Sequence, residues 1–172
     1  MAGAGMGMMR RGISWTSVPD DTEGLTKEFP DVDFSVSGVK TRNSNNKVTC
    51  RLVKNSSGGA LLPSVVVEYK AGAVFQEVDA AAGATAHPAG VVDEYLPAAG
   101  VPDGSWFWIV VHGPTKAIDS GSGITAEVPV ATAASGYIAD ASSPPTEYDL
   151  GFALAEISAT ETGRIFVNLP YT

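Results

Sequence analysis

The stretch VVDEYLPAAGVPDGSWFWIVVHGPTKA at Val91–Ala117 decides the fold class. A segment rich in Gly, Pro and Ala leads into the apolar run Trp106–Val111, whose aromatic and β-branched residues favour a strand over a helix. Successive side chains of a strand point to opposite faces, so Trp106 and Trp108 share one face and Phe107 takes the other. This pattern predicts a strand that lies at the centre of a core or at an interface.

The tail GFALAEISATETGRIFVNLP at Gly151–Pro170 repeats this combination of turns and apolar strands. It predicts strands at Leu150–Ser158 and Arg164–Leu169, with a hairpin turn at Glu161–Gly163. Both faces of this hairpin are substantially apolar. A short chain has little of its own to cover both, so the pattern favours a contact with another subunit.

Turn residues interrupt the rest of the chain so often that strands are expected about every 10 to 15 residues, with almost no helical period. The spacing predicts an all-β fold, a small barrel or sandwich of short antiparallel strands. Thr41–Lys47 is predicted to be a polar turn, and Asp20–Phe29 to form one or two helical turns. The residues expected to be buried are Val48, Leu52, Val65, Val67, Trp106, Trp108, Val110, Leu154, Ile165 and Val167.

The front of the chain differs from the remainder in texture and charge. Residues 1–54 have a formal balance of +2, whereas residues 55–172 have −10. The start is rich in Met and Gly, and we interpret residues 1–46 as an extended N-terminal arm that precedes a β-domain at 47–172. A disordered start and a simple solvated acidic surface remain the alternatives. The candidate partner-binding residues are Met6, Met8, Met9, Arg10, Arg11, Trp15 and Phe29.

Residues that could support catalysis or bind a metal are few and badly spaced. Cys50, His87 and His112 show no metal-ligand spacing, and Cys50 alternates with apolar neighbours as a buried residue would. His112 is expected to end its strand, and the acidic pairs Asp93–Glu94 and Glu147–Asp149 are interpreted as solvated loops. We therefore expect a protein that is not an enzyme, with no catalytic residues, no metal and no cofactor.

The overall charge and the hydropathy limit the kinds of partner and the compartment that the sequence is compatible with. A net charge of −8 argues against nucleic-acid binding, which needs clustered Lys and Arg. The longest apolar run, Trp106–Val111, is far shorter than the roughly 20 residues of a membrane-spanning helix. Arg10 and Arg11 follow the apolar start instead of preceding it, unlike a signal peptide. We expect a product that stays in the cytoplasm where it is made, or in a particle that is assembled there.

Three segments together resemble tailed-phage capsid decoration (cement) proteins: RLVKNSSGGALLP, AGVVDEYLPAAGVPDGSWFWIVVHGP and YDLGFALAEIS…GRIFVNLP. The resemblance covers roughly residues 47–170. It implies a compact β-domain on the capsid exterior of the virion, with an arm that staples neighbouring capsomers. It further implies the major capsid protein as partner and a homo-oligomer, for which a trimer is favoured over a dimer. It implies no catalytic residue.

A second hypothesis comes from a different class of protein. A small β-domain could bind a carbohydrate or another ligand, with Trp106, Trp108 or Tyr95 as stacking platforms. The behaviour of the arm discriminates the two hypotheses, because a cement protein should have an arm that becomes ordered on the capsid, whereas a ligand-binding module should lose nothing when residues 1–40 are removed.

Overall fold

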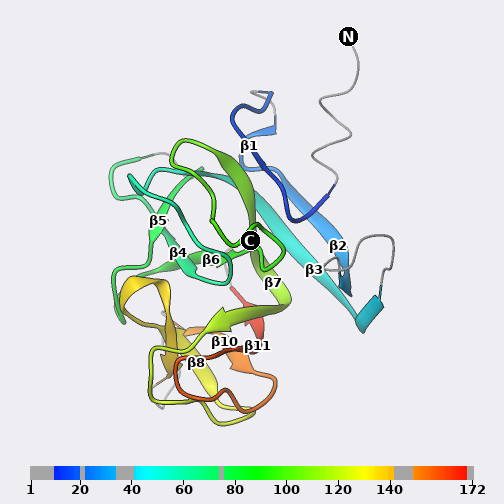
Figure 1. Ribbon diagram of the computed structural model, residues 1–172, viewed down its shortest axis with the longest axis vertical. Helices are drawn as coiled ribbons and strands as arrows, with labels where there is room; N and C mark the ends of the chain where they lie inside the picture. Colours follow the sequence, from blue (N-terminus) through cyan, green and yellow to red (C-terminus); the bar gives the residue numbers. More distant parts are fainter. Residues whose placement is uncertain (1–9, 20–21, 34–40, 74–75, 142–148, 170–172) are drawn as a thin grey trace.

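The computed structural model describes residues 10–19, 22–33, 41–73, 76–141 and 149–169, and it confirms an all-β fold (Figure 1). No helix in these ranges is long and apolar enough to span a membrane. The strands are β1 (Ser14–Trp15), β2 (Thr26–Asp33), β3 (Thr41–Asn55), β4 (Val66–Tyr69), β5 (Glu77–Ala80), β6 (Pro88–Val92), β7 (Trp106–Ile118), β8 (Pro129–Thr132), β9 (Ile138–Asp140), β10 (Asp149–Ala153) and β11 (Thr162–Asn168), with a short 3-10 turn, η2, at Ala134–Gly136.

All the strands belong to one sheet, in the order β2-β3-β5-β4-β6-β7-β11-β10-β8-β9, with β1 beside β7. Because β3 also pairs with β7, five strands form a circuit, and the branch β11-β10-β8-β9 extends beyond it. Because the sheet continues beyond this circuit, the sheet as a whole is not a closed barrel. It is also mixed, since β3 and β5 pair in parallel, whereas only antiparallel pairing was expected. The expectation of uniformly short strands is wrong for β3, with 15 residues, and β7, with 13.

Strand β7 is the centre of the molecule and connects the two ends of the sheet (Figure 1). Trp108 and Val110 join one hydrophobic cluster and Phe107 and Ile109 join the other, and all four are fully buried. Because side chains alternate along a strand, β7 contributes residues to two separate hydrophobic cores. The prediction of a central strand covered on both faces is confirmed.

The predicted core is confirmed at nine of its ten positions, and Leu154 is the exception. Strand β10 ends at Ala153, so Leu154 leaves the sheet and is 42% exposed. Trp108 shows what the buried positions contribute, because its ring meets the Phe29 ring edge-on at a centroid distance of 5.5 Å. Burial of such an aromatic pair is among the larger contributions to the stability of a small domain.

His112 does not end its strand. Strand β7 continues through Gly113 to Ile118 because β11 runs beside it and supplies backbone partners over that whole length. Strand β3 approaches β7 closely at Gly113. This residue has a φ of 103°, and a Cβ there would lie 2.4 Å from the Lys47 carbonyl oxygen. Only glycine fits this position without a backbone shift.

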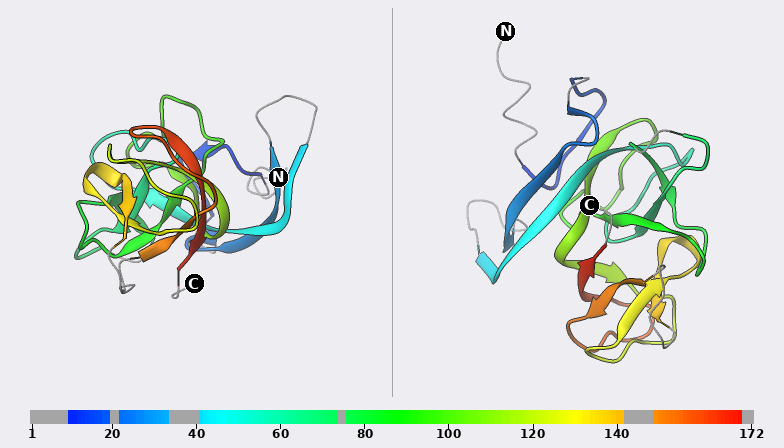
Figure 2. Two further views of the ribbon diagram at one scale, coloured as in Figure 1. Left: turned by 90° about the horizontal axis from the view of Figure 1, so that it is seen from below. Right: turned by 180° about the vertical axis from the view of Figure 1, so that it is seen from behind.

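The segment expected to be a polar turn, Thr41–Lys47, is the first half of β3. Backbone pairing with β2 forms it, as in Val32 opposite Arg42, and this pairing needs no apolar side chains. The described part of Asp20–Phe29 is likewise not helical beyond a short turn, because β2 begins at Thr26. Figures 1 and 2 show the β2–β3 ribbon projecting from the side of the body.

The two C-terminal strands pair with each other, as predicted, with Phe152 opposite Phe166, but the first of them ends at Ala153 and not at Ser158. The turn between them is not at Glu161–Gly163, since β11 already begins at Thr162 and a longer connection precedes it. The buried carboxylate of Asp119 fastens this connection to the loop that follows β7: it accepts a hydrogen bond from the backbone N–H of Thr160 at 3.1 Å, and from those of Gly121 at 2.8 Å and Gly123 at 3.0 Å in its own loop.

Candidate functional site: a polar pocket beside the N-terminal segment

The N-terminal segment is joined to the body by a buried ion pair. The Arg11 guanidinium donates to Asp93 Oδ1 through Nη2 at 2.7 Å and Nε at 3.1 Å, and the backbone N–H of Gly12 donates to Oδ2 at 2.8 Å. Both charged side chains are completely buried. The guanidinium also lies over the Tyr95 ring, 4.9 Å from its centroid. This first stretch of the described chain is therefore part of the folded body.

The electrostatics of the pair favour the ionised state. Burial acts to lower the pKa of Arg11, but the adjacent Asp93 carboxylate outweighs it and raises that pKa above its ordinary value. Cys50, which feels both charges, has its pKa raised to about 12 by burial. The buried thiol expected from the sequence is confirmed, and burial favours its neutral form.

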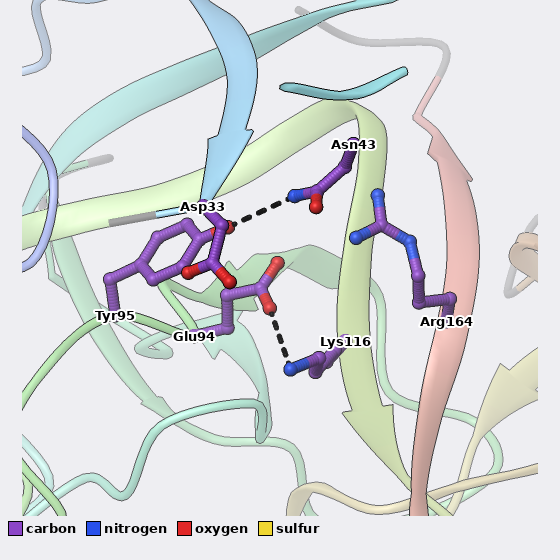
Figure 3. Close-up of a pocket in the computed structure, with 6 residues that line it drawn as sticks. All are labelled: Asp33, Asn43, Glu94, Tyr95, Lys116 and Arg164. Carbon is purple, nitrogen blue, oxygen red and sulfur yellow. Dashed lines mark hydrogen bonds and ion pairs between the residues drawn. The ribbon is translucent and has the colours of Figure 1, made fainter. Parts of the chain in front are cut away.

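Next to this ion pair, six polar side chains line a pocket of about 320 Å³ (Figure 3). They come from strands that lie far apart in the sequence but converge where the β2–β3 ribbon crosses β7 and β11, and from the loop that follows β6. The lining residues are Asp33, Asn43, Glu94, Tyr95, Lys116 and Arg164.

Glu94 is the most unusual group in this pocket. Its side chain is only 3% exposed, and one carboxylate oxygen, Oε2, lies 3.4 Å from Lys116 Nζ. The other oxygen, Oε1, is buried and has no hydrogen-bond partner. Burial raises the pKa of Glu94, although Lys116 opposes the shift. In Figure 3 the unpaired oxygen lies on the side of the carboxylate that faces Asn43 and Arg164.

The opposite wall of the pocket is organised by Asp31, a nearly fully buried residue of β2. Its carboxylate accepts hydrogen bonds from Ser44 at 2.7 Å, from Arg164 at 2.9 Å and from Asn43 at 3.4 Å. Asn43 also donates to the Tyr95 hydroxyl at 3.4 Å. Burial raises the pKa of Tyr95 to about 12, with a further contribution from Glu94. These hydrogen bonds fix the side chains of this wall, and the positive charge of Arg164 is paired with the carboxylate of Asp31.

The side chains of the pocket are all polar and can donate or accept hydrogen bonds. The pocket is lined by carboxylates, an amide, a phenol and two cations, without a histidine or a thiol. Among the described residues, no group of three His, Cys, Asp or Glu side chains is arranged to hold a metal ion. His112, exposed on β7, instead packs edge-on against Phe166 at a centroid distance of 5.2 Å.

The partner-binding residues expected from the sequence are dispersed. Arg10 is exposed, whereas Arg11 is buried in its ion pair and Phe29 is buried against Trp108. Trp15 is half-buried and packs against the main core. These positions leave neither the Arg11 nor the Phe29 side chain accessible to a partner. Met6, Met8 and Met9 lie outside the described residues.

Two residues that the sequence analysis set aside turn out to be central. Asp93 and Glu94 were interpreted as a solvated acidic loop, and this is wrong, because both carboxylates are buried. A signal was present, since the pair directly follows the apolar run of β6 and precedes Tyr95 and Leu96. The partners, Arg11 and Lys116, are too distant in sequence to be assigned from a pattern.

The aromatic residues considered as stacking platforms are in the wrong places for that role. Trp106 is 7% exposed and Trp108 is fully buried, so neither presents a ring face to solvent. Tyr95 is half-buried and already has the Arg11 guanidinium over its ring. The carbohydrate hypothesis therefore loses the platforms on which it was based.

No protein-family model matches the sequence, and a search of curated proteins gives no match. A comparison with solved structures finds a similar fold in the head fiber gp8.5 N base of bacteriophage phi29. The TM-score is 0.51, the sequence identity is 18%, and the match covers 70% of this chain and 94% of that chain. At this level of identity, the likeness establishes that the two chains share a fold.

Proposed function

We propose that this protein is a structural component of a tailed-phage head. More specifically, we propose that it is a decoration (cement) protein, which binds the outside of the shell and stabilises contacts between major capsid protein subunits. The observation that carries the proposal is the likeness of fold to the head fiber base, which extends over 94% of that chain. A shared fold does not imply a shared function by itself. The resemblance of three sequence segments to decoration proteins supports the same role.

The dense packing of the body fits a rigid structural protein. Its two cores on either side of β7 are dense with aromatic and β-branched residues, and its N-terminal segment is anchored by a buried ion pair. A decoration protein gains affinity by presenting a rigid body at many equivalent positions of a symmetric shell, since multivalent attachment offsets weak individual contacts.

The test is binding to shells assembled from the major capsid protein of the same phage genome. The full chain is added to purified shells at increasing concentration and sedimented with them. We expect saturable co-sedimentation and shells that withstand a higher temperature when decorated. An acidic β-protein of similar size and charge serves as control. Absence of co-sedimentation at about 10 μM, a concentration at which even modest interfaces are populated, would reject the proposal.

The role of an N-terminal arm needs a deletion that respects the fold. Removal of residues 1–40 would also remove Arg11 and Phe29, and with them a buried ion pair and part of the core. A chain that begins at Arg10 keeps both. If Met6, Met8 and Met9 contact the shell, this shorter chain will decorate shells less completely than the full chain while its unfolding temperature stays the same. Equal decoration would place the contact on the body.

A further inference from the structure

We propose that the pocket lined by Asp33, Asn43, Glu94, Tyr95, Lys116 and Arg164 binds the cationic end of a basic side chain, arginine or lysine, that belongs to a partner protein. This inference concerns the chemistry of the bound group. It goes beyond the proposed function and does not depend on whether the partner is a capsid subunit.

The first argument is the unsatisfied acceptor in the pocket. Glu94 Oε1 is buried and receives no hydrogen bond, while the side chain as a whole is 3% exposed. A buried carboxylate oxygen without a donor is costly, and native proteins rarely leave one unmatched. A ligand that brings an N–H donor into the pocket removes this cost, whereas an anionic ligand would add to it.

The second argument is the balance of charge. The pocket lining and the ion-paired residues next to it contain four carboxylates, Asp31, Asp33, Asp93 and Glu94, and three cations, Arg11, Lys116 and Arg164. Taken together, these seven side chains have a formal charge of −1, which complements a cation and disfavours an anion. Burial also raises the pKa of Glu94, and a cation bound beside it would bring that pKa back down.

The third argument is an internal precedent in the same loop. Asp93 and Glu94 are consecutive, and Asp93 holds the guanidinium of Arg11 with two hydrogen bonds while the Tyr95 ring covers it. Glu94 has only the partly exposed ammonium of Lys116 at 3.4 Å on one of its oxygens. The pocket volume of about 320 Å³ far exceeds the roughly 30 Å³ that one water occupies, so a guanidinium or ammonium group fits.

The experiment uses the full isotope-labelled chain at low ionic strength and neutral pH. The probes are blocked amino acids, acetylated at the amine and methylamidated at the carboxyl group: arginine, lysine, the uncharged arginine analogue citrulline, and aspartate. We expect saturable NMR shifts of the Asn43, Glu94 and Tyr95 amides with the arginine or the lysine probe, in the millimolar range. Citrulline and aspartate should bind at least about tenfold more weakly, since both lack the positive charge.

Three variants separate pocket binding from a general effect of an acidic protein. Glu94→Gln keeps the shape and removes the charge, and it should weaken the cationic probe about tenfold. Lys116→Met removes the cation that competes for Glu94, and it should tighten binding severalfold. Glu156→Gln, an exposed acid away from the pocket, should change nothing. Circular dichroism and thermal unfolding verify the fold of each variant. If Glu94→Gln does not fold, the binding measured with Lys116→Met decides the test.

Several results would overturn the proposal. One is the absence of pocket shifts with both cationic probes up to about 50 mM, which would mean that only water occupies the space. Another is equal binding of citrulline and arginine, which would show that charge plays no part. Preference for the aspartate probe, unchanged binding by Glu94→Gln, or weaker binding by Lys116→Met would each contradict a cation site at Glu94.

Discussion

Two buried aspartates fasten distant parts of the chain, and they do so with different partners. Asp93 holds the N-terminal segment through the charged guanidinium of Arg11 and one backbone amide. Asp119 holds the connection between β10 and β11 through the backbone N–H of Thr160, and it fixes its own loop through those of Gly121 and Gly123, with no cation. The N-terminal attachment is therefore an ion pair inside the protein, whereas the C-terminal one is a set of hydrogen bonds to neutral groups.

This difference determines how much each attachment matters when one partner is lost. Removal of Arg11 would leave Asp93 charged and buried with hydrogen bonds only from the backbone N–H groups of Gly12 and Tyr95, and an uncompensated buried charge is strongly destabilising. Removal of the Asp119 carboxylate would leave amides of residues that are largely exposed, such as Gly121 and Thr160, and water can replace part of what they lose. The N-terminal attachment should thus be the more sensitive of the two.

The largest effect is expected for Arg11→Ala, which should lower the free energy of unfolding by about 3–5 kcal/mol, as for other broken buried ion pairs. Urea unfolding followed by tryptophan fluorescence measures it. Lys47→Ala breaks the exposed pair with Glu28 and should give no measurable change. A loss under about 1 kcal/mol in Arg11→Ala would mean that the N-terminal segment is not anchored as described.

Asp119→Ala should lower the free energy of unfolding by about 1–3 kcal/mol, because three backbone donors lose their acceptor. Burial opposes the shift, but the hydrogen bonds from Gly123, Gly121 and Thr160 lower the pKa of Asp119 below its ordinary value. Its stabilising contribution is thus present above the unfolded-state pKa of about 3.9 and is lost as the pH falls through the folded-state value. Urea unfolding should show a smaller gap in the free energy of unfolding between Asp119→Ala and the unmodified protein in acid than at pH 7. The exposed Asp140→Ala is the control, and a gap that widens in acid would contradict this assignment.

Cys50 should make folding less favourable in alkali. Burial raises the pKa of its thiol to about 12, so between the unfolded value and that pH the unfolded chain loses a proton that the folded chain keeps. Stability should therefore fall with rising pH by up to about 1.4 kcal/mol per unit above pH 8.5 or so. Cys50→Ala should show a shallower fall between pH 8 and 10. Equal slopes, or rapid thiol labelling of the native protein at pH 8, would show that the thiol is not shielded.

The smallest effect is expected on the outer face of the C-terminal hairpin. Phe152 stacks on Phe166 at a centroid distance of 5.4 Å but remains 40% exposed. Phe152→Ser should change the free energy of unfolding by no more than about 0.5–1 kcal/mol, whereas Ile165→Ala, at a fully buried position of β11, should cost about 2–4 kcal/mol. Thermal unfolding of the two variants side by side measures the contrast. Similar losses would mean that Phe152 is covered in solution.

The sequence predicts the β class and most of the core because these follow from local alternation. The apolar run at Trp106–Val111 suffices to predict a strand that is buried on both faces, and the pairing of the two C-terminal strands with each other follows from their order, although their register does not. The same reasoning fails where a strand is stabilised only by its backbone partner. Thr41–Lys47 is polar enough to be interpreted as a turn, yet β2 pairs with it.

The candidate site could not be predicted because its residues meet only through long-range contacts. Arg11 and Asp93 are 82 positions apart, and Asp31 and Arg164 are 133 apart. A charged residue in a Met- and Gly-rich segment has the local pattern of a free arm, and only the presence of a buried partner shows otherwise. The acidic pair Asp93–Glu94 is misjudged for the same reason.

The most direct test of the proposed role is electron cryomicroscopy of heads assembled from the major capsid protein of the same phage genome, with and without the full chain. We predict additional density on the outer surface at symmetry-related positions, into which the body built around β7 fits as a rigid unit. Heads that show a bare outer surface at a saturating concentration of the chain, or density only on the inner face, would contradict the assignment.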